Sequence, residues 1–169
     1  LEALQTVAGD DGRIDGRALQ NLNTLETGGD LHAFHATLNW YAAGLQSVFL
    51  QDANSLIIKP PDLIDILTHL KKRFSWVQRI TSYARSHTIA RISDENLSAF
   101  RRAGLNRIHI GLESGADVVL KSVYKGATQA THIKAGCKVK KAGMQLSEYV
   151  MPGLGGREHS KVHALETAK

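Results

Sequence analysis

The chain has 169 residues, of which 43% are hydrophobic, and its formal net charge is +5. This length suits one domain, and this composition suits an ordinary globular core. No apolar run approaches the ~18 residues that a membrane-spanning helix needs, so the sequence predicts no membrane partner. The first residues show neither a basic start nor an apolar stretch, so they indicate no signal peptide and predict a cytoplasmic location.

The basic residues form short groups and not one continuous patch. The groups are Lys71–Arg73, Arg101 with Arg102, and the lysines of residues 138–141. Each group lies near the end of an expected helix, where cations suit the negative end of the helix dipole. No aromatic residues interleave with them, as a stacking platform for nucleic acid would require. The sequence therefore favours solvated helix ends over nucleic-acid binding.

Residues 1–29 are expected to form a loose lead-in, with one short helix near residues 17–25. Residues 30–169 are expected to form a β/α core that begins with a helix over residues 30–43. The next expected element is the first strand, over residues 47–50. These two segments make up the predicted domain organisation.

One short phrase recurs three times, as "AAGLQSVFL", "RAGLNRIHI" and "KAGMQLSEYV". In each copy a helical run is followed by Ala-Gly, a short turn and a strand pattern. The glycines, Gly44, Gly104 and Gly143, are predicted to adopt the left-handed conformation that ends a helix. The repeat is half of a β/α unit, and it predicts that such units succeed one another along the chain.

The remaining elements alternate in the same way. Helices are expected over residues 61–74, 93–103, 117–123 and 128–142, and strands over residues 78–82, 107–112 and 146–151. Strands separated by helices predict an α/β fold with four parallel strands, each next to its successor, and helices on one face. We interpret this as a partial TIM-type barrel, with a doubly wound sheet as the alternative. Because four strands cannot close a barrel, and because the chain starts with leucine and stops within an expected helix, we interpret the sequence as a fragment.

Polar or glycine-rich residues follow every expected strand. Because parallel strands point their carboxyl ends to one edge, we expect these residues to form one ligand site. Asp52 and Glu113 can accept hydrogen bonds from hydroxyl or ammonium groups, and Arg85 can hold a carboxylate. Such a set suits a ligand with an amino group, a carboxylate, a ribose and an aromatic base.

The segments "VFLQDANSLI", "ITSYAR", "IHIGLESGADVVLKSVYKGAT" and "SEYVMPGLGGREHS" resemble the radical S-adenosylmethionine (radical SAM) superfamily in order and spacing. They are most similar to its bacterial members of unassigned substrate. The resemblance covers about residues 45–168 and implies that the chain holds strands two to five of a six-stranded partial barrel.

The resemblance also implies where the cofactor binds. Gln51–Ala53 occupy the loop that usually reads Gly-Gly-Glu and holds the methionine amino group, while Lys125 matches a basic position near the methionine carboxylate. Glu113 and Ser114 match positions that contact the ribose hydroxyls and methionine, and residues 151–155 match the segment that lines the adenine. The predicted cofactor-binding residues are Gln51, Asp52, Ala53, Ser82, Arg85, Glu113, Ser114, Lys125, Met151 and Gly153.

A radical SAM enzyme uses a 4Fe-4S cluster to cleave SAM reductively, and the 5′-deoxyadenosyl radical then abstracts hydrogen from a substrate. The resemblance implies this activity on an unknown substrate, with SAM, the cluster and an electron donor such as flavodoxin or ferredoxin. However, the Cys-x-x-x-Cys-x-x-Cys motif that holds the cluster is absent, and Cys137, in an expected helix, is the one cysteine. The sequence thus indicates no metal ligands in this chain and leaves the catalytic residues unknown. Either the cluster loop lies upstream of Leu1 or the chain is inactive.

Two other interpretations stay open. The chain could be another β/α-barrel enzyme, whose phosphate-bearing substrate binds at "GLGG", or a degenerate module without activity. His32 and His35 are three residues apart on an expected helix, but no Glu-x-x-His partner helix accompanies them, so they do not indicate a metal site.

Overall fold

The structure, a computed structural model, describes residue 15 and residues 31–169. The chain divides into two compact units, residues 1–45 and 46–169, and each is described by itself. In the first unit, α3 spans Leu31–Ala42, and Gly44 after it has a φ of 79°, as the glycine pattern predicts. The helix expected near residues 17–25 lies outside the described residues. The predicted division into a lead-in and a core stays a prediction.

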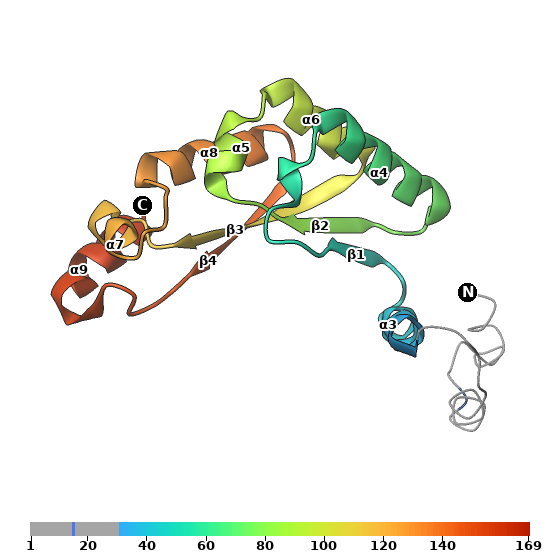
Figure 1. Cartoon of the computed structure of the whole chain (residues 1–169), viewed down its shortest axis with the longest axis horizontal. Coiled ribbons are helices and arrows are strands. Elements are labelled where there is room, and N and C mark those ends of the chain that lie inside the picture. The colour runs from blue at the N-terminus through green and yellow to red at the C-terminus, as the bar shows by residue number, and fades with distance from the viewer. Residues whose placement is uncertain (1–14, 16–30) are drawn as a thin grey trace. The chain divides into compact units, whose positions relative to one another are not determined.

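The second unit is built on a parallel sheet of four strands in the order β1-β2-β3-β4 (Figure 1). The strands are β1 Ser47–Leu50, β2 Arg79–Tyr83, β3 Leu105–Glu113 and β4 Gln145–Val150. Each strand pairs in parallel with its successor, so the predicted α/β architecture is confirmed. The order is that of a partial TIM-type barrel, in which β1 and β4 form the two edges of the described sheet.

Helices follow each strand. They are the short 3₁₀ helix η1 Ser55–Ile57, α4 Pro60–Arg73, α5 Ser86–Arg91, α6 Asp94–Ala103, α7 Asp117–Ser122, α8 Gln129–Lys141 and α9 Gly156–Thr167. Figure 1 shows α4, α5, α6 and α8 over one face of the sheet, while α7 and α9 lie beyond the ends of β3 and β4. None of the described helices is long and apolar enough to cross a membrane.

Local signals explain the helix boundaries. The Ser93 side chain accepts a hydrogen bond from the Asn96 N–H and begins α6, and Thr128 does the same for Thr131 at α8. Gly104 ends α6 with a φ of 119°, a conformation that a residue with a Cβ adopts only at a cost. The sequence did not predict α5, which has only six residues and no side-chain cap.

The core lies between the sheet and its helix layer. Ile80, Ile108 and Ile110 of the strands and Leu67 and Phe100 of the helices are all fully buried. Because strand side chains alternate between two faces, the residues next to these isoleucines lie on the opposite face. That opposite face and the carboxyl ends of the strands carry the candidate site.

Candidate functional site

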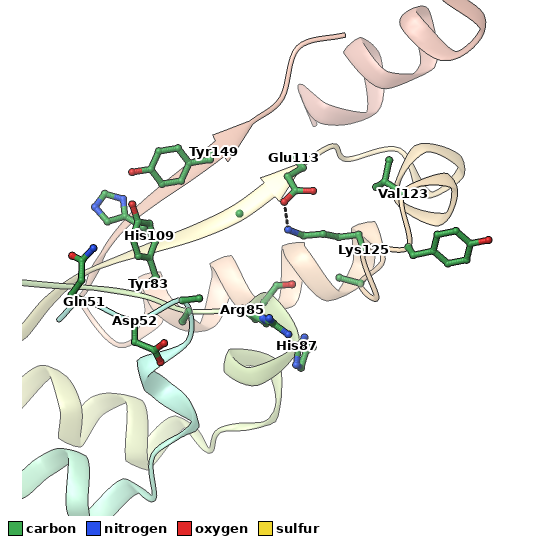
Figure 2. Close-up of a pocket in the computed structure, with 16 residues that line it drawn as sticks. Gln51, Asp52, Tyr83, Arg85, His87, His109, Glu113, Val123, Lys125 and Tyr149 are labelled. Carbon is green, nitrogen blue, oxygen red and sulfur yellow. Dashed lines mark hydrogen bonds and ion pairs between the residues drawn. The ribbon is translucent and has the colours of Figure 1, made fainter. Parts of the chain in front are cut away.

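A cavity of about 850 Å³ lies at the carboxyl ends of the strands (Figure 2). Its walls come from the loop after β1, from β2 with the start of α5, from β3, from the loop after α7, and from β4. The lining residues are Gln51, Asp52, Ala53, Tyr83, Ala84, Arg85, Ser86, His87, His109, Gly111, Glu113, Val123, Tyr124, Lys125, Ala127 and Tyr149. Small-molecule sites commonly have volumes of ~300–1,000 Å³, so this cavity is large enough for a cofactor.

Glu113 and Lys125 form an ion pair in this cavity, which is drawn as a dashed line in Figure 2. Their side chains are 29% and 24% exposed, so water screens the pair less than it screens a surface pair. Glu113 has a φ of 63°, a left-handed conformation that is uncommon for a residue with a side chain. Its carbonyl oxygen accepts a hydrogen bond of 3.0 Å from the Met151 N–H, which joins the end of β3 to the chain after β4.

The residues after Glu113 explain why its backbone turns in this way. Ser114 is fully buried, and its Oγ lies 2.8 Å from Nδ1 of His163 on α9 and accepts a hydrogen bond from the Ala116 N–H. A Cβ on Gly115 would lie 2.3 Å from the Glu166 carbonyl oxygen, so this position has no room for a side chain. Ser114 and Gly115 therefore fasten the loop to α9, and Glu113 lies at the cavity.

Asn54 holds the opposite wall in place. Its Oδ1 accepts a hydrogen bond of 3.0 Å from the Arg85 N–H, and its Nδ2 donates one of 3.1 Å to Thr88 Oγ1. These bonds tie the loop after β1 to the start of α5. The exposed Asp52 side chain, two residues earlier, is thereby kept at the cavity wall.

Aromatic side chains form the remaining wall. Tyr83, His109 and Tyr149 line the cavity, and the ring centroids of neighbouring members are 5.5–6.1 Å apart. Burial, assisted by the positive charge of Arg107, lowers the pKa of His109 below its usual value. A hydrogen bond with Tyr149, together with the proximity of that phenol, raises the pKa of Tyr83. Both shifts favour the uncharged forms of the His109 imidazole and the Tyr83 phenol.

The structure brings together part of the predicted site. The predicted residues that line the cavity are Gln51, Asp52, Ala53, Arg85, Glu113 and Lys125. Four others lie elsewhere. Ser82 is fully buried on the helix-covered face, where its Oγ donates to the Tyr83 carbonyl, and Ser114 contacts α9. Met151 and Gly153 follow β4 and do not line this cavity. The cofactor-binding roles of all these residues stay predictions.

Sequence reasoning missed Tyr83, His109 and Tyr149. The sequence held a signal for two of them, because Tyr83 lies three residues after the apolar Ile80, on the other face of an alternating strand, and His109 lies between Ile108 and Ile110. Strict alternation of faces would have assigned both to the site.

The comparisons with known proteins concern the fold. No protein-family model matches the sequence, and no curated protein matches it. Among solved structures, the cobalamin-dependent S-adenosylmethionine radical enzyme OxsB, with aqua-cobalamin bound, matches 62% of this chain and 16% of its own. That match has a TM-score of 0.53 and 23% identity. Methylornithine synthase (PylB) matches 63% of this chain and 30% of its own, with a TM-score of 0.50 and 15% identity.

The fold of this chain is therefore similar to a segment of the fold of these radical SAM enzymes. At this identity the likeness is one of fold, and it confirms the resemblance found in the sequence at that level. The chain spans less than a third of the length of either neighbour.

Proposed function

We propose that this chain is part of a radical SAM enzyme and binds S-adenosylmethionine in the cavity at the strand ends. One observation carries the proposal. Glu113 holds a strained backbone conformation with its carboxylate paired to Lys125 inside the cavity, on a fold shared with a radical SAM enzyme. Backbone strain of this kind persists only where the surrounding structure maintains it, and it is often found at functional sites.

The charges in the cavity suit the amino-acid end of S-adenosylmethionine, which carries an ammonium and a carboxylate. Glu113 is an acceptor for the ammonium, and Lys125 is a donor for the carboxylate. The two side chains satisfy each other in the absence of a ligand, so a zwitterion can replace the ion pair without leaving either charge unpaired. Asp52, on the opposite wall, is an acceptor for ribose hydroxyls.

The residues of this chain do not fit an iron–sulfur cluster. Such a cluster takes cysteine thiolates, and the chain has one cysteine, Cys137, which is exposed on α8. Among the described residues, no three His, Cys, Asp or Glu side chains lie together as a metal site. The finer proposal, reductive cleavage of SAM with an electron from flavodoxin or ferredoxin, therefore requires cluster ligands from outside this sequence.

Calorimetric titration of S-adenosylmethionine into the 169-residue chain tests the proposal. Glu113→Gln keeps the shape of the side chain and removes its charge. A hydrogen bond to a charged group contributes about 1.5–3 kcal/mol, against ~1 for a neutral pair, so we expect the affinity to fall about tenfold. The matched control is Glu158→Gln, since Glu158 is 86% exposed on α9 and does not line the cavity.

Two results would contradict the proposal: no binding heat with the parent chain, or equal affinities for the parent and Glu113→Gln. A titration with inorganic phosphate belongs in the same series. Binding of phosphate without binding of S-adenosylmethionine would favour the alternative of a barrel enzyme with a phosphate-bearing substrate.

A further inference from the structure

Four aromatic rings form a continuous surface across the sheet, on the face opposite to α4, α5, α6 and α8. Each strand contributes one ring: Phe49 of β1, Tyr83 of β2, His109 of β3 and Tyr149 of β4. Phe49 stacks on His109 with a centroid distance of 5.7 Å and an interplanar angle of 15°. Tyr83 contacts Phe49, His109 and Tyr149, at centroid distances of 4.9, 5.6 and 6.1 Å. We call these four residues the ring cluster.

The ring cluster differs from the core in its exposure. Phe49 is 37% exposed and Tyr149 is 49% exposed, whereas the isoleucines on the helix-covered face of the same strands are fully buried. Apolar ring area in contact with water is unfavourable unless something covers it. The described part of the second unit supplies no such cover, which makes the ring cluster a candidate binding surface.

Three members of the ring cluster share one cavity with the charged residues, and the fourth, Phe49, stacks on His109 without lining it. Tyr83, His109 and Tyr149 line it together with Glu113 and Lys125, so the cavity has an aromatic wall and a charged wall (Figure 2). A charged wall of this kind suits the amino-acid end of a cofactor. The aromatic wall has no charged group to pair with the amino-acid end of a cofactor. It is therefore free to bind a second chemical group.

The chemistry of the aromatic wall favours a flat ring with polar edges. The lowered pKa of His109 keeps its imidazole neutral at pH 7, so the ring can donate one hydrogen bond and accept one. Its buried Nδ1 has no hydrogen-bond partner among the described residues, and stacking on Phe49 holds the ring. The hydroxyls of Tyr83 and Tyr149 add further donors and acceptors beside the stacking faces. Aromatic faces bind flat π systems in offset stacks, and the polar edges select heteroatoms.

We propose that the ring cluster binds the planar heteroaromatic ring of a substrate, beside the cofactor end of the same cavity. The position beside S-adenosylmethionine rests on the proposed function. The chemistry of the ligand rests on the ring cluster alone. The same ring chemistry could come from the adenine of the cofactor, so the test must separate these two sources.

The experiment compares two neutral probes that carry the same amide group. Nicotinamide has a flat heteroaromatic ring, and cyclohexanecarboxamide has a saturated one. Both are titrated into the 169-residue chain and followed by NMR chemical-shift changes of the protein. Stacking of a base on an aromatic side chain contributes about 1–3 kcal/mol, so we expect nicotinamide to bind about tenfold more tightly than cyclohexanecarboxamide.

Two variants of Tyr149 localise the binding. Tyr149→Leu removes the stacking face from a half-exposed position and should weaken nicotinamide binding about tenfold, while Tyr149→Phe keeps the face and should retain most of the affinity. Trp76→Leu is the distant control. Trp76 is 41% exposed, packs on Phe74 outside the cavity, and should leave the affinity unchanged.

A repeat of the titration with saturating S-adenosylmethionine separates the two sources. Unchanged nicotinamide affinity supports a separate substrate ring, whereas competition assigns the ring cluster to the adenine and overturns the proposal. Equal affinity for both probes, or no effect of Tyr149→Leu, also overturns it. If Tyr149→Asp converts an oligomer of this chain into a monomer, the ring cluster is a contact between copies of the chain, and this result also overturns the proposal. Absence of S-adenosylmethionine binding with retained nicotinamide binding would contradict only the proposed function.

Discussion

Glu113 combines an unfavourable backbone conformation with a charge at the cavity. Its φ of 63° places a residue with a Cβ in the left-handed region, which costs about 1–2 kcal/mol per residue. Glycine would avoid this cost and occupies other left-handed positions of the chain, such as Gly104 and Gly153, while Leu45 and Tyr124 have a positive φ as Glu113 does. At Glu113 this conformation coincides with a carboxylate at the cavity, so stability and a role of the side chain can be tested separately.

This conflict between stability and function leads to a prediction at the scale of one residue. Glu113→Gly and Glu113→Gln both remove the carboxylate and its ion pair with Lys125, but only glycine relieves the backbone. Glycine also loses more conformational freedom on folding, by roughly 0.5–1 kcal/mol, which offsets part of the gain. We expect Glu113→Gly to be more stable than Glu113→Gln by about 0.5–1 kcal/mol in urea unfolding. A less stable glycine variant would show that the side chain supports the fold.

At the scale of elements, α9 holds the loop that follows Glu113 at the end of β3. The Gly115 N–H donates to Thr167 Oγ1 at 2.9 Å, and Gln129 Nε2 of α8 donates to the Glu166 carbonyl at 3.2 Å. The buried hydrogen bond between Ser114 and His163 adds a third contact. The end of α9 is thus fixed against both the β3–α7 loop and the start of α8.

Gly115→Ala tests this arrangement. The added Cβ would lie 2.3 Å from backbone of α9, which cannot yield as a side-chain end can, so α9 or the loop must move. We expect a loss of about 1–3 kcal/mol in the free energy of unfolding, as for other overpacked sites, and weaker S-adenosylmethionine binding. Both can be measured by urea unfolding and calorimetry of the same variant.

Gly136→Ala in α8 is the matched control for Gly115→Ala. Its Cβ would meet the ends of two side chains, Leu146 Cδ2 at 3.2 Å and Glu148 Oε1 at 3.8 Å. Alanine is also favoured over glycine in a helix by roughly 0.5–1 kcal/mol. Its cost should therefore be much smaller. Equal costs for the two variants would mean that the contact between Gly115 and α9 is not tight.

At the scale of the whole molecule, the described sheet has two open edges. β1 and β4 each pair with one neighbour, so one side of each carries backbone groups without a strand partner in the described residues. The ring cluster also leaves aromatic area in water. Strands with an open edge can pair with other chains and promote aggregation.

We therefore expect the 169-residue chain to melt at or below the range of ~45–65 °C that is usual for mesophilic domains, or to aggregate on heating. Differential scanning calorimetry with light scattering measures both. A reversible, cooperative transition of a monomer above that range would show that the open edges do not limit its stability.

Local and periodic features of the sequence were sufficient for the architecture. The spacing of apolar residues and the glycines after each helix predicted four parallel strands with helices between them, because helix ends and strand alternation depend on near neighbours. The strand ends predicted that Asp52, Arg85 and Glu113 lie near one another, and these residues do line one cavity, since parallel strands share one carboxyl edge.

Only the tertiary structure decided which of the side chains at the end of β3 reach that site. The pairing of β3 with β4 shifts register between Gly111 and Glu113, and this shift depends on the neighbouring strand. Ser114 meets His163, which lies 49 residues further along the chain. Contacts over such separations arise from packing, and no local pattern in the sequence encodes them.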